Sequence, residues 1–219
     1  MTRFFLSLVA TALVTFFAAC EKNELFIGSD TIVAEVRDIA AFDKIDISEA
    51  LNAEVTFGAT TSVTVRANDN LIDRVETTVS GGELVLKMAP GNYRETDITV
   101  IITMPTLAGI EASGASNIDA VGFIDMTNLD IDASGASNLQ LANSSATTLT
   151  ADVSGASDVD AFGLAVMTAS VNVSGASNLK VMVADELSGR ASGASSVHYR
   201  GNPTLNVEVS GASNVVDAN

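Results

Sequence analysis

Serine nucleophiles paired with a histidine base are the first chemistry to consider, because the chain is rich in serine. Such a nucleophile needs a base beside it, and the only histidine is His198. His198 follows Gly193 by five residues, and the same place after earlier glycines holds other polar types. Those residues are Asp119, Gln140, Asp160 and Lys180. We therefore predict that His198 is a surface residue and that the chain has no catalytic residues.

A second candidate is a mostly acidic set of residues, each three positions before one of six regularly spaced glycines. The set is Glu111, Asp132, Asp152, Asn172, Arg190 and Glu208. If successive segments stack as strands, the first three carboxylates lie about 5 Å apart on one face. Carboxylates that close repel one another unless water or a cation screens them, and oxygen ligands suit Ca²⁺ or Mg²⁺. Since side chains on a flat sheet cannot surround an ion, we predict solvent screening, no metal and no other cofactor. Glu111, Asp132, Asp152 and Asn172 form the candidate binding face.

The elements that position these side chains follow from one phrase, Ser-Gly-Ala-Ser-Asn, which recurs with small changes. Its six copies have their glycines at Gly114, Gly135, Gly155, Gly175, Gly193 and Gly211. The intervals between these glycines are 21, 20, 20, 18 and 18 residues. A fixed period near twenty residues is typical of a solenoid.

Apolar residues occupy every second position on both sides of each glycine, which is the period of a β strand. The residues four positions after the glycines are Ile118, Leu139, Val159, Leu179, Val197 and Val215. One strand cannot bury such a face alone, but stacked coils about 4.8 Å apart would join the apolar columns into a core. The sequence thus predicts an all-β, single-domain parallel β-solenoid. An up-and-down barrel is the alternative, but it would use hairpin turns of varied chemistry.

The six glycines are predicted to form the corner of each coil, because glycine adopts positive φ without strain. The last residue of the phrase forms a column of its own: Asn117, Asn138, Asp158, Asn178, Ser196 and Asn214. Stacked amides can hydrogen-bond along such a column. We interpret it as structural and expect Asp158 and Ser196 to interrupt it.

Residues 1–19 have the features of an export signal: Arg3, an apolar run from Phe4 to Phe17, and two small residues before Cys20. Small residues before a cysteine resemble the lipobox of bacterial lipoproteins, in which the cysteine is acylated. We therefore predict lipidation of Cys20, a tether over residues 20–32, and a lipid-anchored location in the cell envelope. A plain secretory signal is the alternative. A single cysteine excludes an internal disulfide.

The net negative charge of the chain restricts the classes of molecule that it can bind. The chain has 11 basic and 27 acidic residues, a net charge of −16, and removal of Arg3 with the signal leaves 10 against 27, or −17. Such a surface repels nucleic acid but accepts basic partners and neutral sugars. We predict no nucleic-acid partner, a membrane contact through the N-terminal lipid, and a glycan or protein partner on another surface. The oligomeric state stays open.

Residues 33–107 also alternate as strands but lack the repeat, and they are predicted to be the irregular first coils of one domain over residues 33–217. Three segments of this region carry a family resemblance: Phe42-Asp43-Lys44-Ile45-Asp46-Ile47, Val63-Thr64-Val65 and Asp69-Asn70-Leu71-Ile72-Asp73. Together with the Ser-Gly-Ala-Ser repeats from residue 113, they resemble the head GIN domain family of auto-transporter adhesins.

This resemblance implies an exported or lipid-anchored bacterial protein with a fold like the right-handed β-helix of pectin lyases, without a catalytic set. It also implies a role in adhesion. The sequence thus favours a non-enzymatic, lipid-anchored envelope protein that presents a solenoid face. The alternative is a polysaccharide-active β-helix enzyme, a lyase or hydrolase, because the same fold can host such sites.

Overall fold

The computed structural model describes residues 24–219, which form β strands and one short 3₁₀ helix, η1 (Ile72–Arg74). Within these residues no helix is long and apolar enough to cross a membrane. The N-terminal strands are β1 (Leu25–Ile27), β2 (Ile32–Arg37), β3 (Lys44–Ile47), β4 (Asn52–Phe57), β5 (Ser62–Asn68), β6 (Val75–Ser80), β7 (Glu83–Met88), β8 (Asn92–Arg94) and β9 (Thr99–Met104). The strands of the repeats are β10 (Gly109–Ala112), β11 (Asn117–Val121), β12 (Met126–Ala133), β13 (Asn138–Ala142), β14 (Ser144–Val153), β15 (Asp158–Val173), β16 (Asn178–Ala191), β17 (Ser196–Arg200), β18 (Thr204–Val209) and β19 (Asn214–Asp217).

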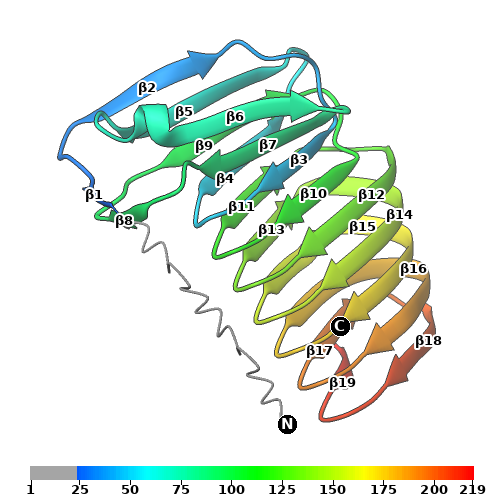
Figure 1. Ribbon diagram of the computed structural model, residues 1–219. Coiled ribbons are helices and arrows are strands. Elements are labelled where there is room, and N and C mark those ends of the chain that lie inside the picture. The colour runs from blue at the N-terminus through cyan, green and yellow to red at the C-terminus, as the bar shows by residue number, and fades with distance from the viewer. Residues whose placement is uncertain (1–23) are drawn as a thin grey trace, which may run out of the picture.

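The repeats wind into a stack of coils with two long parallel faces (Figure 1). Face A consists of β3, β10, β12, β14, the second halves of β15 and β16, and β18. Face B consists of β4, β11, β13, the first parts of β15 and β16, β17 and β19. The predicted parallel β-solenoid with about twenty residues per coil is confirmed.

The six repeated glycines lie at the corner where face A turns into face B. Their φ angles run from 73° to 79°, in the left-handed region that glycine tolerates. Successive corners also stack closely: the Ala156 N–H donates to the Gly135 carbonyl at 2.8 Å. A Cβ added to Gly155 would lie 2.4 Å from that same oxygen. The glycine is therefore required both for the turn and for the contact between coils.

A second corner, which was not predicted from the sequence, lies eight residues after the first in several coils. Gly122, Asn143 and Gly201 have φ angles of 89°, 51° and 98° there. Gly163 occupies the same place, and a Cβ on it would lie 2.5 Å from the Leu141 carbonyl oxygen. The recurrence of glycine or asparagine at this spacing was the available signal.

The N-terminal part adds strands of opposite direction to the parallel stack. β3 and β4 pair in parallel with β10 and β11, and with β7 and β9 on their other side. β6 then pairs antiparallel with β7, while β5 and β2 extend the sheet antiparallel from β9. We call β2, β5 and β6 the cap. One continuous apolar core runs through cap and coils, with Leu84, Leu86 and Met104 among its larger side chains.

Part of the segment expected to be a tether is structured. Leu25–Ile27 forms β1, which pairs in parallel with β8, and β2 begins at Ile32. Four residues, 21–24, separate Cys20 from the first strand in the sequence. The predicted signal over residues 1–19 and Cys20 itself lie outside the described residues.

Candidate binding face

The predicted acidic column stands on face A, on the outer side of adjacent strands. Glu111 pairs in register with Asp132, Asp132 with Asp152, and Asp152 with Asn172. The row continues through Arg190 and Glu208. All six are exposed, and the first four are flanked on both sides by buried aliphatic residues. The solenoid therefore places Glu111, Asp132, Asp152 and Asn172 in one line across four strands.

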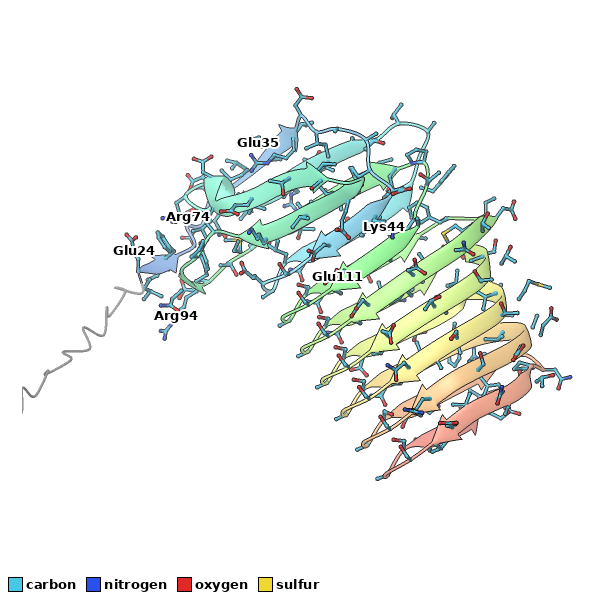
Figure 2. All side chains as sticks on the ribbon, turned by 45° about the vertical axis from the view of Figure 1, so that its right-hand side comes forward. Glu24, Glu35, Lys44, Arg74, Arg94 and Glu111 are labelled. Carbon is cyan, nitrogen blue, oxygen red and sulfur yellow. The ribbon has the colours of Figure 1, made fainter. Side chains whose placement is uncertain are left out.

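The structure extends this row beyond the repeats. Asp46 of β3 pairs with Glu111 of β10 and adds a fourth carboxylate at the capped end. The alternation Lys44-Ile45-Asp46-Ile47 matches Gly109-Ile110-Glu111-Ala112, and that match could have revealed Asp46 in the sequence. Figure 2 shows Lys44 and Glu111 on neighbouring strands of this face.

A second outward row runs beside the first, two residues earlier in each strand. It begins with the register partners Lys44 and Glu83 and continues across the repeats. Its members there are Gly109, Asp130, Thr150, Ser170, Ser188 and Asn206. Hydroxyl and amide groups thus replace charges toward the C-terminal end.

Face A is hollowed along these two rows. A hollow of about 250 Å³ is lined by Lys44, Glu83, Glu111, Asp130 and Asp132, among others. A second, of about 520 Å³, is lined by Ser170, Asn172, Ser188, Arg190 and Asn206, among others. Thr150 and Asp152 line both hollows. The two hollows are therefore continuous and form one groove that crosses the strands along the solenoid axis.

The N-terminal half of the groove is strongly acidic. Partial burial raises the pKa of Glu111 above its ordinary value, and the neighbouring Asp46, Asp132 and Glu83 raise it further. Burial likewise raises the pKa of Asp46, with a further increase from Glu83 and an opposing effect of Lys87. The adjacent carboxylates therefore repel one another, because the raising effect of neighbouring acidic groups on the pKa of Glu111 is unopposed.

The C-terminal half of the groove pairs its own charges. Asn172 Nδ2 donates to Asp152 Oδ1 at 3.0 Å, and Arg190 Nη2 donates to Glu208 Oε2 at 2.9 Å. Both members of the Arg190–Glu208 pair are more than half exposed. This half presents donors and acceptors side by side, an arrangement suited to a polar, uncharged partner.

Face B carries the asparagine column. The residue type at each position of the column decides whether neighbouring coils are joined by a side-chain hydrogen bond. Asn138 donates to Asn117, and Asn117 donates to Asn52 of β4, each at 2.8 Å. Asn178 donates to Asp158 at 2.7 Å, and Ser196 donates to Asn214. Because Asn138 already donates to Asn117, its free oxygen faces the Asp158 carboxylate, and two acceptors cannot bond. The column is thus divided into short segments that tie neighbouring coils together.

The repeated serines have a structural place. The second serine of the phrase is buried in five copies: Ser116, Ser137, Ser157, Ser177 and Ser195. Its hydroxyl donates to the carbonyl of the first serine in three of them, at 2.7 to 2.9 Å. His198 lies on β17 of face B, with Lys180 and Val216 as register partners. The buried hydroxyls are therefore placed to satisfy the corner backbone rather than to attack a substrate.

Among residues 24–219, no three His, Cys, Asp or Glu side chains converge in a set that could hold a metal ion. The carboxylates of face A stand in a row on parallel strands.

Comparison with known proteins places this architecture in a family. Residues 41–203 match the family described as "Putative auto-transporter adhesin, head GIN domain". No protein with a curated description matches the chain in sequence.

Solved structures share the fold at low sequence identity. A structure described as a putative adhesin from Bacteroides fragilis is 18% identical, with a TM-score of 0.72, over 87% of this chain and 98% of that one. A putative adhesin from Parabacteroides merdae is 17% identical, with a TM-score of 0.56, over 88% and 98%. A structure from Parabacteroides distasonis described as a putative lipid binding protein is 15% identical, with a TM-score of 0.53, over 88% and 98%.

Proposed function

This chain belongs to the head GIN domain family of auto-transporter adhesins, and we propose that it is a non-enzymatic adhesin anchored by lipid in the cell envelope. Membership of an adhesin-like family indicates a cell-surface or envelope protein. The proposal adds the anchor, the absence of turnover and the surface that binds.

The groove of face A is the observation that carries the proposal. It runs across successive strands, so it can contact an extended partner at many points rather than enclose a small one. Its groups change from carboxylates at the capped end to amides, hydroxyls and a paired arginine at the other. An extended glycan or protein segment that lies along the axis would meet both kinds of surface.

Binding should depend on the charge of face A rather than on the total charge of the protein. We expect the double variant Asp132→Lys and Asp152→Lys to lose or change binding on an array of glycans and envelope proteins, and to change its salt dependence. The matched control is Glu54→Lys and Asp119→Lys, because these carboxylates are register partners on face B. Equal effects of the two double variants would refute face A as the binding surface.

The lipid anchor has a separate test. Acylation is what would hold an otherwise acidic domain at a membrane, so Cys20→Ser should move the protein from the membrane fraction to a soluble or uncleaved form. Persistence of the variant in membranes after alkaline and high-salt washing would contradict the anchor.

A further inference from the structure

The short ribbon of β1 and β8 projects from the capped end of the solenoid and is held firmly. Phe26 stacks on Tyr93 with ring centroids 5.4 Å apart, and the Arg74 guanidinium lies 3.9 Å from the Phe26 ring centroid. The Tyr93 hydroxyl donates to the Ala89 carbonyl, and Tyr93 packs against the main core. Backbone bonds from Asn92 to Glu24 and from Gly28 to Arg94 extend the pairing at both ends. The direction of each ribbon side chain is therefore fixed by the body of the protein.

The two sides of this ribbon differ in composition. In a parallel pair, register partners point to the same side, and Leu25 pairs with Asn92 while Ile27 pairs with Arg94. The side opposite the Phe26–Tyr93 stack thus carries Leu25, Ile27, Asn92 and Arg94. Leu25 is 49% exposed and Ile27 is 51% exposed. Figure 2 shows Arg94 beside β1, at the end of the molecule where the described chain begins.

Two aliphatic side chains next to an arginine and an amide make a surface suited to the interface of a bilayer. Aliphatic groups enter the boundary between head groups and acyl chains, while arginine remains among the phosphates. The chain as a whole carries 27 acidic and 11 basic residues, so a side with an arginine and no acidic residue differs from its average composition.

The position of the ribbon in the sequence, close to Cys20, indicates which partner its outer side contacts. Leu25 follows Cys20 by five residues, which span about 17 Å at full extension. We infer that the outer side of the β1–β8 ribbon rests on the phospholipid surface, with Leu25 and Ile27 inserted at shallow depth. This inference rests on the lipid anchor proposed above, because the anchor keeps the ribbon within reach of the bilayer.

Contact at the ribbon gives the molecule an orientation. The ribbon lies at the side of the cap, and the last coil, with β18 and β19, is the end of the coil stack farthest from the cap (Figure 1). The groove of face A then begins near the membrane with its acidic half and continues away from it with its polar half. A partner would meet the polar half first.

Depth-dependent quenching tests this contact. The acylated full-length chain is placed in vesicles of phosphatidylcholine and phosphatidylethanolamine that carry bromine on the acyl chains. A fluorophore is attached through Ile27→Cys, which is selective because an acylated Cys20 has no free thiol. The matched control is Leu205→Cys, since Leu205 is 47% exposed on β18 in the last coil.

The expected result is quenching of about two-fold or more at position 27 and none at position 205, because shallow insertion brings position 27 near the upper acyl chain. Adding Leu25→Asn should reduce the quenching at position 27 while leaving Tm unchanged. A chain that floats with the vesicles but shows equal signals at both positions would overturn the ribbon contact and leave the anchor intact. A chain that does not float with the vesicles would overturn both.

Discussion

The repeated coils and the N-terminal part place the same kinds of residue on the same two faces, but they are held together differently. In the repeats, glycine corners stack on one another, aliphatic columns fill the core, and buried serines bond the corner carbonyls. In the N-terminal part the core is filled by similar side chains, such as Leu86 and Met104. The cap strands then cover the open edge of the stack by pairing antiparallel with it.

The two ends of the solenoid differ in the same way. At the C-terminal end no strand within residues 24–219 covers β18 and β19, and Leu205 and Val209 are about half exposed. Asp217 stands where the preceding coils place Tyr199 and Val181. A charge at an inward position discourages further strand addition. The capped end is thus covered by added antiparallel strands, whereas the last described coil carries a charged residue at an inward register position.

The largest expected loss of stability comes from replacing a corner glycine of the repeats, compared with a turn glycine of the N-terminal part. Gly155 and Gly81 both have positive φ, at 75° and 61°, but a Cβ on Gly81 would meet nothing within 4 Å. Gly81→Ala should cost only the strain of the conformation, about 1–2 kcal/mol. Gly155→Ala adds a clash with the backbone of the preceding coil at Gly135 and should cost about 3 kcal/mol or more. Denaturant unfolding of the two variants measures the difference, and equal losses would refute the stacked corner.

The next largest loss of stability is expected from removing hydrogen bonds of buried polar side chains. Asn68 in β5, which belongs to the cap, donates to the Ser29 carbonyl at 2.7 Å and accepts from the Asp97 N–H at 2.8 Å. The Ser157 hydroxyl accepts one longer hydrogen bond, of 3.3 Å, from the Ser137 N–H, whereas the bond to the Ser177 hydroxyl is donated by the Ser157 backbone N–H and does not involve its side chain. Asn68→Ala should therefore cost about 2–3 kcal/mol and Ser157→Ala about 1 kcal/mol, because lost bonds leave buried partners unpaired. A larger loss at Ser157 would show that the serines, rather than the cap, hold the molecule.

The smallest effect concerns the acidic half of the groove. Because the folded-state pKa of Glu111 lies above its ordinary value of 4.5, its charged form opposes folding. Its contribution to stability is fully present below pH 4.5 and is lost as the pH rises through the folded-state pKa. Glu111→Gln should therefore raise Tm slightly at pH 7 and leave it unchanged at pH 4. A decrease of Tm at pH 7 would show that Glu111 has a stabilising partner.

The repeated half could be predicted well from the sequence because each of its strands has the same pattern. Apolar alternation indicated the strands, and the glycine period indicated the stacking, so the line from Glu111 to Asn172 follows from residue spacing alone. The antiparallel cap was not predicted, since single strands such as Ser62–Asn68 alternate identically whichever direction their partner runs. Asp46 was missed because its segment lacks the glycine that served as the alignment mark.

The groove itself could not be predicted from the sequence. Its lining includes Gly109 in one half and Gly189 in the other, where no side chain fills the space between the neighbouring strands' residues. The β1–β8 ribbon depends on a pairing between segments more than sixty residues apart, Leu25–Ile27 with Asn92–Arg94. Short strands of three residues have too little pattern for such a pairing to be predicted.

Binding without turnover is the central claim, and the fate of a captured ligand tests it most directly. The purified mature domain is incubated with any polysaccharide that it retains, and with pectins and alginates, and the products are analysed for new reducing ends and unsaturated sugars. We expect that every ligand is recovered intact and that retention requires the charge of Asp132 and Asp152. Shortened or unsaturated products that disappear with Glu111→Gln would contradict the account and identify the carboxylate row as the active site of a polysaccharide-cleaving enzyme.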